Sequence, residues 1–263
     1  MKKIIRTPLN YSQPHVYYCY INPLCVEELL QIVDDLKGEE VFSKPQASFQ
    51  TIGVLQNHRE GSDFIRSYFG TKDLEKIWSL KTLSGKQNYM VSRIAMKDAA
   101  CHFLREKKGE DIPPHELYCT HNPFGQPIVH REGWLSEPLN SLFISLSHKD
   151  NQGVAIVSNQ PVGIDIEKIE SKSEAFLQFA YTKKELSLIE DLNPSGSKAF
   201  GTSETVIRFW VAKESCAKKT GRGFQGKPQA FEVTGFEGDV IRVGDTLVQT
   251  TEIGENYIVG WTF

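Results

Sequence analysis

Hydrophobic and polar positions alternate most regularly between residues 160 and 170, in the run QPVGIDIEKIE. The apolar positions are Val162, Ile164 and Ile166, and the positions between and after them are Gly163, Asp165 and Glu167. Alternation over this length predicts a half-buried β-strand. Residues i and i+2 lie on the same face of a strand, so the two carboxylates are expected side by side, opposite the isoleucines. On the carboxylate face, the glycine is expected to let a ligand approach the backbone.

A helical period follows in the run 208–223, RFWVAKESCAKKTGRG. Trp210, Glu214 and Lys218 are spaced at i, i+4 along one helix face, and Gly221 is expected to end the helix. If this helix packs on the strand, three carboxylates converge beside lysines, which suits a divalent cation and a phosphorylated substrate. The alternative is a solvated pair of strand acids and a surface Glu–Lys pair stabilising the helix by about 0.2–0.5 kcal/mol.

The remaining pattern predicts elements on both sides of this pair. Helices are expected at 26–36 and 86–106, and strands at 15–22, 116–120, 142–146 and 153–158. The sequence Thr182-x-x-Glu185 has the form of a capping box and predicts a helix start. After residue 230, alternation predicts several strands up to the last residue.

A short internal repeat indicates how the chain is organised. The segment 94–100, IAMKDAA, is similar to 210–216, WVAKESC, and each is followed by a proline and a strand. This recurrence predicts an α+β fold of two pseudo-symmetric lobes, each a helix packed on a small antiparallel sheet. We expect an N-terminal lobe at 1–159, a C-terminal lobe at 160–263, and the active-site cleft between them.

Composition narrows the functional classes. The 263 residues are 40% hydrophobic and 24% charged, as in ordinary globular proteins, and the net charge of −3 gives no general attraction to nucleic acid. The five cysteines are odd in number and scattered, which favours a reduced, cytoplasmic setting. No apolar run indicates a signal peptide or a membrane helix.

Four motifs together resemble the 4′-phosphopantetheinyl transferase superfamily. G-I-D-I-E and W-x-x-K-E-S-x-x-K carry the resemblance, while Phe124–Pro127 and Ser145–His148 are similar to the family's G-K-P and S-x-S-H elements, in the same order. At this length the chain resembles the larger, two-lobed, monomeric type associated with surfactin synthetase activation. The run S-R-I-A-M-K-D-A is similar to members serving polyketide or polyunsaturated fatty acid synthases.

The resemblance implies transfer of 4′-phosphopantetheine from coenzyme A to a serine hydroxyl of an apo acyl or peptidyl carrier protein, releasing adenosine 3′,5′-bisphosphate. Asp165, Glu167 and Glu214 would hold Mg²⁺, with Mn²⁺ as an alternative. Glu214 is the favoured general base and Glu167 the other candidate. Lys218 would neutralise a pyrophosphate oxygen, and Lys213 would either assist it or only brace the helix.

Further positions are implied to bind coenzyme A. The motif match gives Ser147 and His148 a role at the 3′-phosphate, although a histidine after a buried strand is often a packing residue. Arg93 and Lys97 are candidates for the same phosphate, and a solvated helix face is their alternative. Gln126 replaces the family's usual lysine beside Pro127, so a cation is missing there, although the backbone of this turn could still shape the adenine pocket.

Two other functions remain open at this point. Paired acids would also suit a metal-dependent nucleotide phosphohydrolase, but that function does not account for S-x-S-H or for W-x-x-K-E-S. A non-catalytic relative that binds coenzyme A or a carrier protein is the second alternative, and Gln126 is the feature that favours it.

Overall fold

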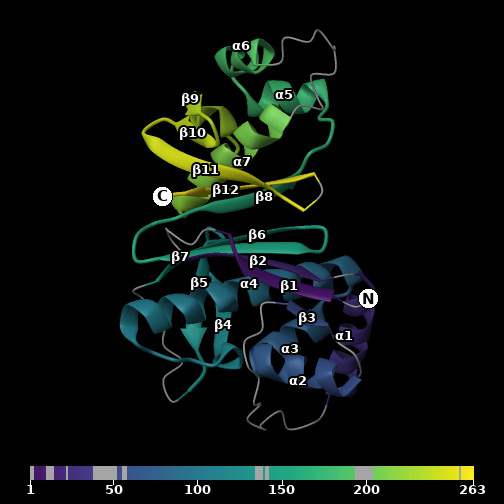
Figure 1. Cartoon of the computed structure of the whole chain (residues 1–263). Coiled ribbons are helices and arrows are strands. Elements are labelled where there is room, and N and C mark those ends of the chain that lie inside the picture. The colour runs from purple at the N-terminus through teal and green to yellow at the C-terminus, as the bar shows by residue number, and fades with distance from the viewer. Residues whose placement is uncertain are drawn as a thin grey trace. The chain divides into compact units, whose positions relative to one another are not determined.

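The computed structural model describes residues 3–9, 15–21, 23–37, 52–54, 58–133, 139, 142–192, 204–254 and 256–263. Its internal contacts divide the chain into two compact units (Figure 1). Unit 1 comprises Met1–Asn122 and Pro127–Asn159, and unit 2 comprises Pro123–Gln126 and Gln160–Phe263. We propose that these units are the two domains of the protein.

Unit 1 is a helix-covered antiparallel sheet with a separate hairpin. Its strands are β1 (Lys3–Pro8), β2 (His15–Ile21), β3 (Ile52–Val54), β4 (Leu117–His121), β5 (Pro127–Arg131), β6 (Phe143–Lys149) and β7 (Gln152–Ser158). Its helices are α1 (Pro23–Asp35), α2 (His58–Tyr68), α3 (Thr71–Ser79) and α4 (Leu83–Lys108), followed by the short 3₁₀ helix η1 (Pro114–Glu116). The sheet order is β3-β1-β2-β7-β6, and β4 pairs with β5.

Helix α4 is the main helix of unit 1. Thr82 caps its start by accepting a hydrogen bond from the backbone N–H of Gly85, and Gly109 ends it in the left-handed conformation. The helix packs on β7 and β2. A Cβ atom at Gly153 in β7 would lie 2.4 Å from the carbonyl oxygen of Val91, so the helix can approach this closely only over a glycine.

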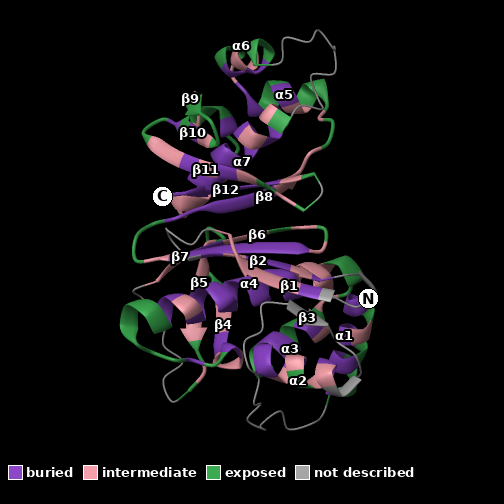
Figure 2. Cartoon of the chain, in the orientation of Figure 1, coloured by how far each residue is buried: buried purple, intermediate pink, exposed green. Residues whose placement is uncertain are grey.

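Unit 2 repeats this arrangement. It contains β8 (Ile164–Lys168), α5 (Glu174–Ala180), α6 (Lys183–Asp191), α7 (Glu204–Lys219), the 3₁₀ helix η2 (Pro228–Ala230), β9 (Val233–Glu237), β10 (Val240–Val243), β11 (Thr246–Ile253) and β12 (Tyr257–Thr262). The sheet order is β8-β12-β11-β10-β9, with every neighbouring pair antiparallel. Helix α7 packs on β12 and β8, and buried residues run along both strands (Figure 2).

The predicted fold class is confirmed. In each unit a long helix packs on an antiparallel sheet, and the order helix, 3₁₀ turn and strands recurs as α4-η1-β4 and α7-η2-β9. The cleft expected between the lobes stays a prediction.

The sequence pattern did not predict β1, β3 or α5. Helix α5 is seven residues long, too short for a helical period to stand out, and Ser173 caps it by accepting from the backbone N–H of Phe176. Of the helices that the structure describes, none combines the length and the hydrophobicity needed to cross a membrane.

Candidate functional site

The candidate site lies where α7 packs against β8 (Figure 1). Gly163, just before β8, touches the helix so closely that an added Cβ would lie 1.8 Å from the carbonyl oxygen of Ser215. The missing side chain therefore admits the backbone of α7, and the expectation that it admits a ligand is wrong. Because side chains alternate along a strand, Asp165 and Glu167 lie on the same side of it as Gly163, toward α7.

Asp165 is buried, with only 5% of its surface exposed. Its Oδ1 atom accepts a hydrogen bond from Lys218 Nζ at 2.6 Å. The reading of the strand acids as a solvated face is therefore wrong for this residue. A charge that is so buried needs a partner of opposite sign, and the lysine from α7 supplies it.

The Glu214 carboxyl group is affected by the same charges. Its pKa is raised to about 7, mainly by burial and then by the negative charge of Asp165, with a smaller contribution from Glu167, while the positive charge of Lys218 opposes the rise. Helix and strand therefore bring the three predicted carboxylates within electrostatic range of one another. A carboxyl group with a pKa near 7 can take up and release a proton at neutral pH, as a general base must.

The donor set has the chemistry of a divalent-cation site. Asp165 and Glu167 both raise the pKa of Glu214, and these three carboxylates are hard oxygen donors whose mutual repulsion a cation would relieve. Among the residues that the structure describes, however, no three His, Cys, Asp or Glu side chains are already placed to hold one metal ion. The residues fit a cation in charge and ligand type, while Lys218 is the cation that contacts Asp165 here.

Lys213 does not reach the site. Its side chain is fully buried, and Nζ donates to the carbonyl oxygen of Ala180 at 2.6 Å and to the Glu185 carboxylate at 2.8 and 2.9 Å. This contradicts a direct contact with coenzyme A and agrees with the alternative that the lysine braces the helix. Sequence reasoning recognised Glu185 only as a capping residue, because nothing in the pattern connects it with a lysine 28 positions away.

Lys97 occupies the equivalent place in α4 and is also wrongly predicted. Its side chain is fully buried, and Nζ binds the Asp73 carboxylate and the carbonyl oxygen of Tyr68. An amine without exposed surface, held by two acceptors, is not available to a phosphate arriving from solvent.

Of the other predicted phosphate contacts in unit 1, two are more accessible to solvent than Lys97 and one is buried. His148 is exposed and Ser147 half-buried near the end of β6. Arg93 in α4 is 5% exposed, so the solvated helix face is wrong for it, and its guanidinium lies 4.6 Å from the centre of the Tyr89 ring. These three positions stay predictions as phosphate contacts.

Gln126 belongs to a short segment of unit 2 that lies against the end of α7. A Cβ at Gly221, which has a φ of 72°, would lie 2.8 Å from Gln126 Oε1. The neighbouring Phe124 ring lies 5.7 Å from the Arg222 guanidinium carbon. The turn before Pro127 is thus held at the C-terminal end of the helix that carries Glu214, and its role toward coenzyme A stays a prediction.

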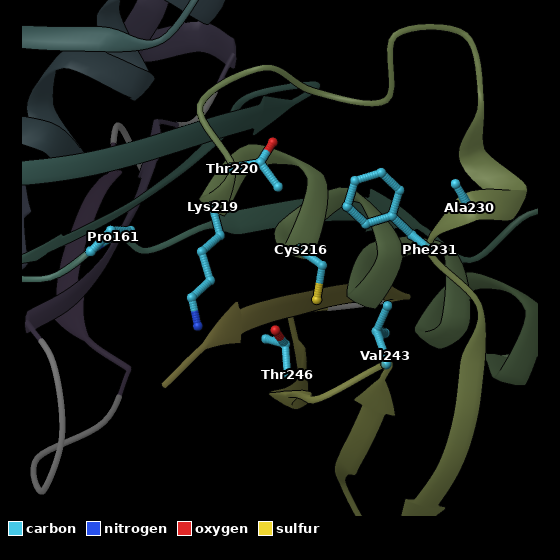
Figure 3. A pocket seen from close by; sticks show the side chains of 9 residues that line it. Pro161, Cys216, Lys219, Thr220, Ala230, Phe231, Val243 and Thr246 are labelled. Atoms are coloured by element: carbon cyan, nitrogen blue, oxygen red, sulfur yellow. The ribbon is translucent and has the colours of Figure 1, made fainter.

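A pocket of about 420 Å³ lies in unit 2 at the C-terminal end of α7 (Figure 3). Lys219 and Thr220 contribute polar groups, and Cys216 and Phe231 lie among the less polar ones. Burial raises the pKa of the Cys216 thiol to about 12, so this side chain acts as an apolar wall and not as a nucleophile. None of the predicted site residues lines the pocket, although Lys219 directly follows Lys218.

Comparisons with known proteins point to one family. Residues 161–260 match the family model described as the 4′-phosphopantetheinyl transferase superfamily. The chain is also 28% identical, over 146 residues, to the 4′-phosphopantetheinyl transferase gsp of Aneurinibacillus migulanus. That alignment covers 52% of this chain and 55% of the relative, so the chain spans about half the length of the curated relative that it matches.

Proposed function

From the resemblance of this chain to the 4′-phosphopantetheinyl transferase superfamily, which the comparisons confirm, we propose that the protein transfers 4′-phosphopantetheine from coenzyme A to a carrier protein. The acceptor is a serine hydroxyl of an apo acyl or peptidyl carrier protein, and adenosine 3′,5′-bisphosphate is released. The observation that carries this proposal is the electrostatic coupling of Glu214 to Asp165, Glu167 and Lys218. These residues belong to the two motifs on which the resemblance rests and lie within the matched segment.

The carboxylates of α7 and β8 are the proposed metal ligands. Asp165, Glu167 and Glu214 would hold Mg²⁺, or Mn²⁺ as an alternative. When bound, the ion supplies positive charge to the pyrophosphate of coenzyme A, where negative charge builds up during phosphoryl transfer. Lys218, on the same helix as Glu214, provides a second positive charge, which could neutralise a pyrophosphate oxygen.

The serine hydroxyl must lose a proton as it attacks the β-phosphorus. Glu214 is the proposed acceptor, because an acid on the helix beside the strand carboxylates can serve both the metal and the nucleophile. Glu167, half-buried on the same side of β8 as Asp165, is the other candidate base. The bond from the phosphorus to the bridging oxygen breaks, and the bisphosphate leaves with that oxygen.

Unit 1 supplies the proposed contacts to the 3′-phosphate. The residues are His148, Ser147 and Arg93. Lys97 is not among the proposed contacts, because its side chain is fully buried. Gln126 and Pro127 are the proposed contacts to the adenine. Because the cysteines of this chain are all free, we propose a reducing compartment, the cytoplasm, and we propose that the protein acts as a monomer.

The proposal is tested by measuring the mass of a carrier protein before and after incubation. Apo acyl and peptidyl carriers are incubated with the protein, coenzyme A and Mg²⁺, and their intact masses are measured. We expect a gain of one phosphopantetheinyl group on at least one carrier, and none on the same carrier with its acceptor serine changed to alanine. A panel of unmodified carriers would contradict transfer, and bisphosphate released without any carrier would indicate a phosphohydrolase.

A further inference from the structure

A fully buried ion pair links α7 to three other segments of unit 2. Lys213 Nζ contacts both carboxylate oxygens of Glu185 in α6 and the carbonyl oxygen of Ala180, the last residue of α5. The Glu185 carboxylate also accepts the backbone N–H of Thr182 at 2.7 Å and that of Val233, at the start of β9, at 2.9 Å. Both side chains are fully buried, and each carboxylate oxygen has more than one donor.

Unit 1 contains a counterpart at the equivalent position of α4. Lys97 likewise binds the carbonyl oxygen of Tyr68, the last residue of α2, and the carboxylate of Asp73 in the first turn of α3. Each amine also lies over the ring that follows the preceding helix, with Lys97 5.6 Å from the centre of Phe69 and Lys213 5.1 Å from that of Tyr181. The two buried ion pairs have the same arrangement, so the pair in unit 1 can serve as a control for the pair in unit 2.

The buried ion pair in unit 2 adjoins the candidate site, because Lys213 immediately precedes Glu214 in α7. Consecutive residues of an α-helix are separated by about 100° of rotation, so fixing one side chain sets the direction of the next. Three acceptors on two segments hold the lysine amine, and they prevent α7 from rotating about its axis without leaving a charge buried and unpaired.

We propose that Glu185 is a positioning residue that acts through Lys213 to aim Glu214 at Asp165 and Glu167. Glu185 itself touches neither coenzyme A nor the carrier. This inference rests on the proposed function, since it assigns Glu185 to the same centre.

The test compares Glu185→Gln with Asp73→Asn, which removes the equivalent charge from unit 1. Both variants are expected to lower the melting temperature, because each leaves a buried lysine without its counter-charge. Only Glu185→Gln is expected to lower kcat for carrier modification, by about 10–100-fold, with the KM for coenzyme A within about twofold of the wild type. The conservative Glu185→Asp variant keeps the charge and should recover part of the lost rate.

A second readout does not depend on activity. Mn²⁺ binding in the presence of coenzyme A, followed by electron paramagnetic resonance, is expected to weaken about tenfold in Glu185→Gln and to stay unchanged in Asp73→Asn. Equal losses in both variants, wild-type values in folded Glu185→Gln, or no Mn²⁺ binding by the wild type would overturn the positioning role. A wild type that binds Mn²⁺ but modifies no carrier would overturn the proposed function, and the Mn²⁺ affinities would still decide the role of Glu185.

Discussion

Replacing Asp165 by asparagine is expected to lower the kcat of phosphopantetheinyl transfer by about 10²–10³-fold, the usual effect of removing one preorganised charge from a reacting centre. Asparagine keeps the size of the side chain and can still accept from Lys218, whose amine lies 2.6 Å from Asp165 Oδ1. Alanine is the poorer choice, because Asp165 is buried and its removal would leave the lysine without a partner. Transfer is measured from the carrier's mass gain over time.

The matched control is Asp191→Asn, the same change at an exposed acid at the end of α6. It should leave both the transfer rate and the melting temperature close to wild type. Near-normal transfer by a folded Asp165→Asn protein would remove Asp165 from the proposed metal ligands.

Replacing Glu214 by glutamine is expected to abolish transfer and, at pH 8 without metal, to stabilise the protein. The folded state holds the pKa of Glu214 at about 7, above its ordinary value, so ionising this group costs folding free energy. The cost is absent below the unfolded pKa, grows as the pH rises toward 7, and is complete above it. The pKa rises from 4.5 to about 7 and each unit corresponds to about 1.4 kcal/mol, so we expect the free energy of unfolding to rise by about 3–4 kcal/mol at pH 8.

Thermal unfolding of both proteins between pH 4 and pH 8 tests the predicted direction of this stability difference. The stability difference between Glu214→Gln and the wild type should shrink toward zero near pH 4, where both states of the wild type are protonated. Adding Mg²⁺ and coenzyme A at pH 8 should stabilise the wild type more than the variant. A variant that is less stable than the wild type at pH 8 without metal would contradict the crowding of negative charge at this position.

The sequence predicted the parts of the fold that have a strong period. The alternation at 160–170 predicted β8, the i, i+4 spacing at 208–223 predicted α7, and the short repeat predicted two helix-on-sheet lobes. Helix α5 was missed because it spans only seven residues. Strand β1 was missed because its residues, KIIRTP, lack a sustained alternation.

Burial of charged groups could not be read from the sequence. Lys97 and Lys213 look like solvent-facing or phosphate-binding lysines, because the carboxylates that bury them lie 24 and 28 residues away along the chain. Asp165 looks like the outward position of a half-buried strand, but it is buried, and α7 packs closely over the neighbouring Gly163. In each case a tertiary contact, and not the local pattern, decides whether a charged side chain faces solvent.

The most direct test of the central claim is a Mn²⁺ titration of the wild type and of Asp165→Asn, each with coenzyme A and with a protein-free control. The fraction of free Mn²⁺ is followed by electron paramagnetic resonance. If Asp165, Glu167 and Glu214 hold one divalent cation, the wild type should bind one Mn²⁺ per chain and the variant should bind it at least about tenfold more weakly. Equal affinity in the two proteins, or no binding beyond the protein-free control, would contradict the metal centre on which the proposed transfer depends.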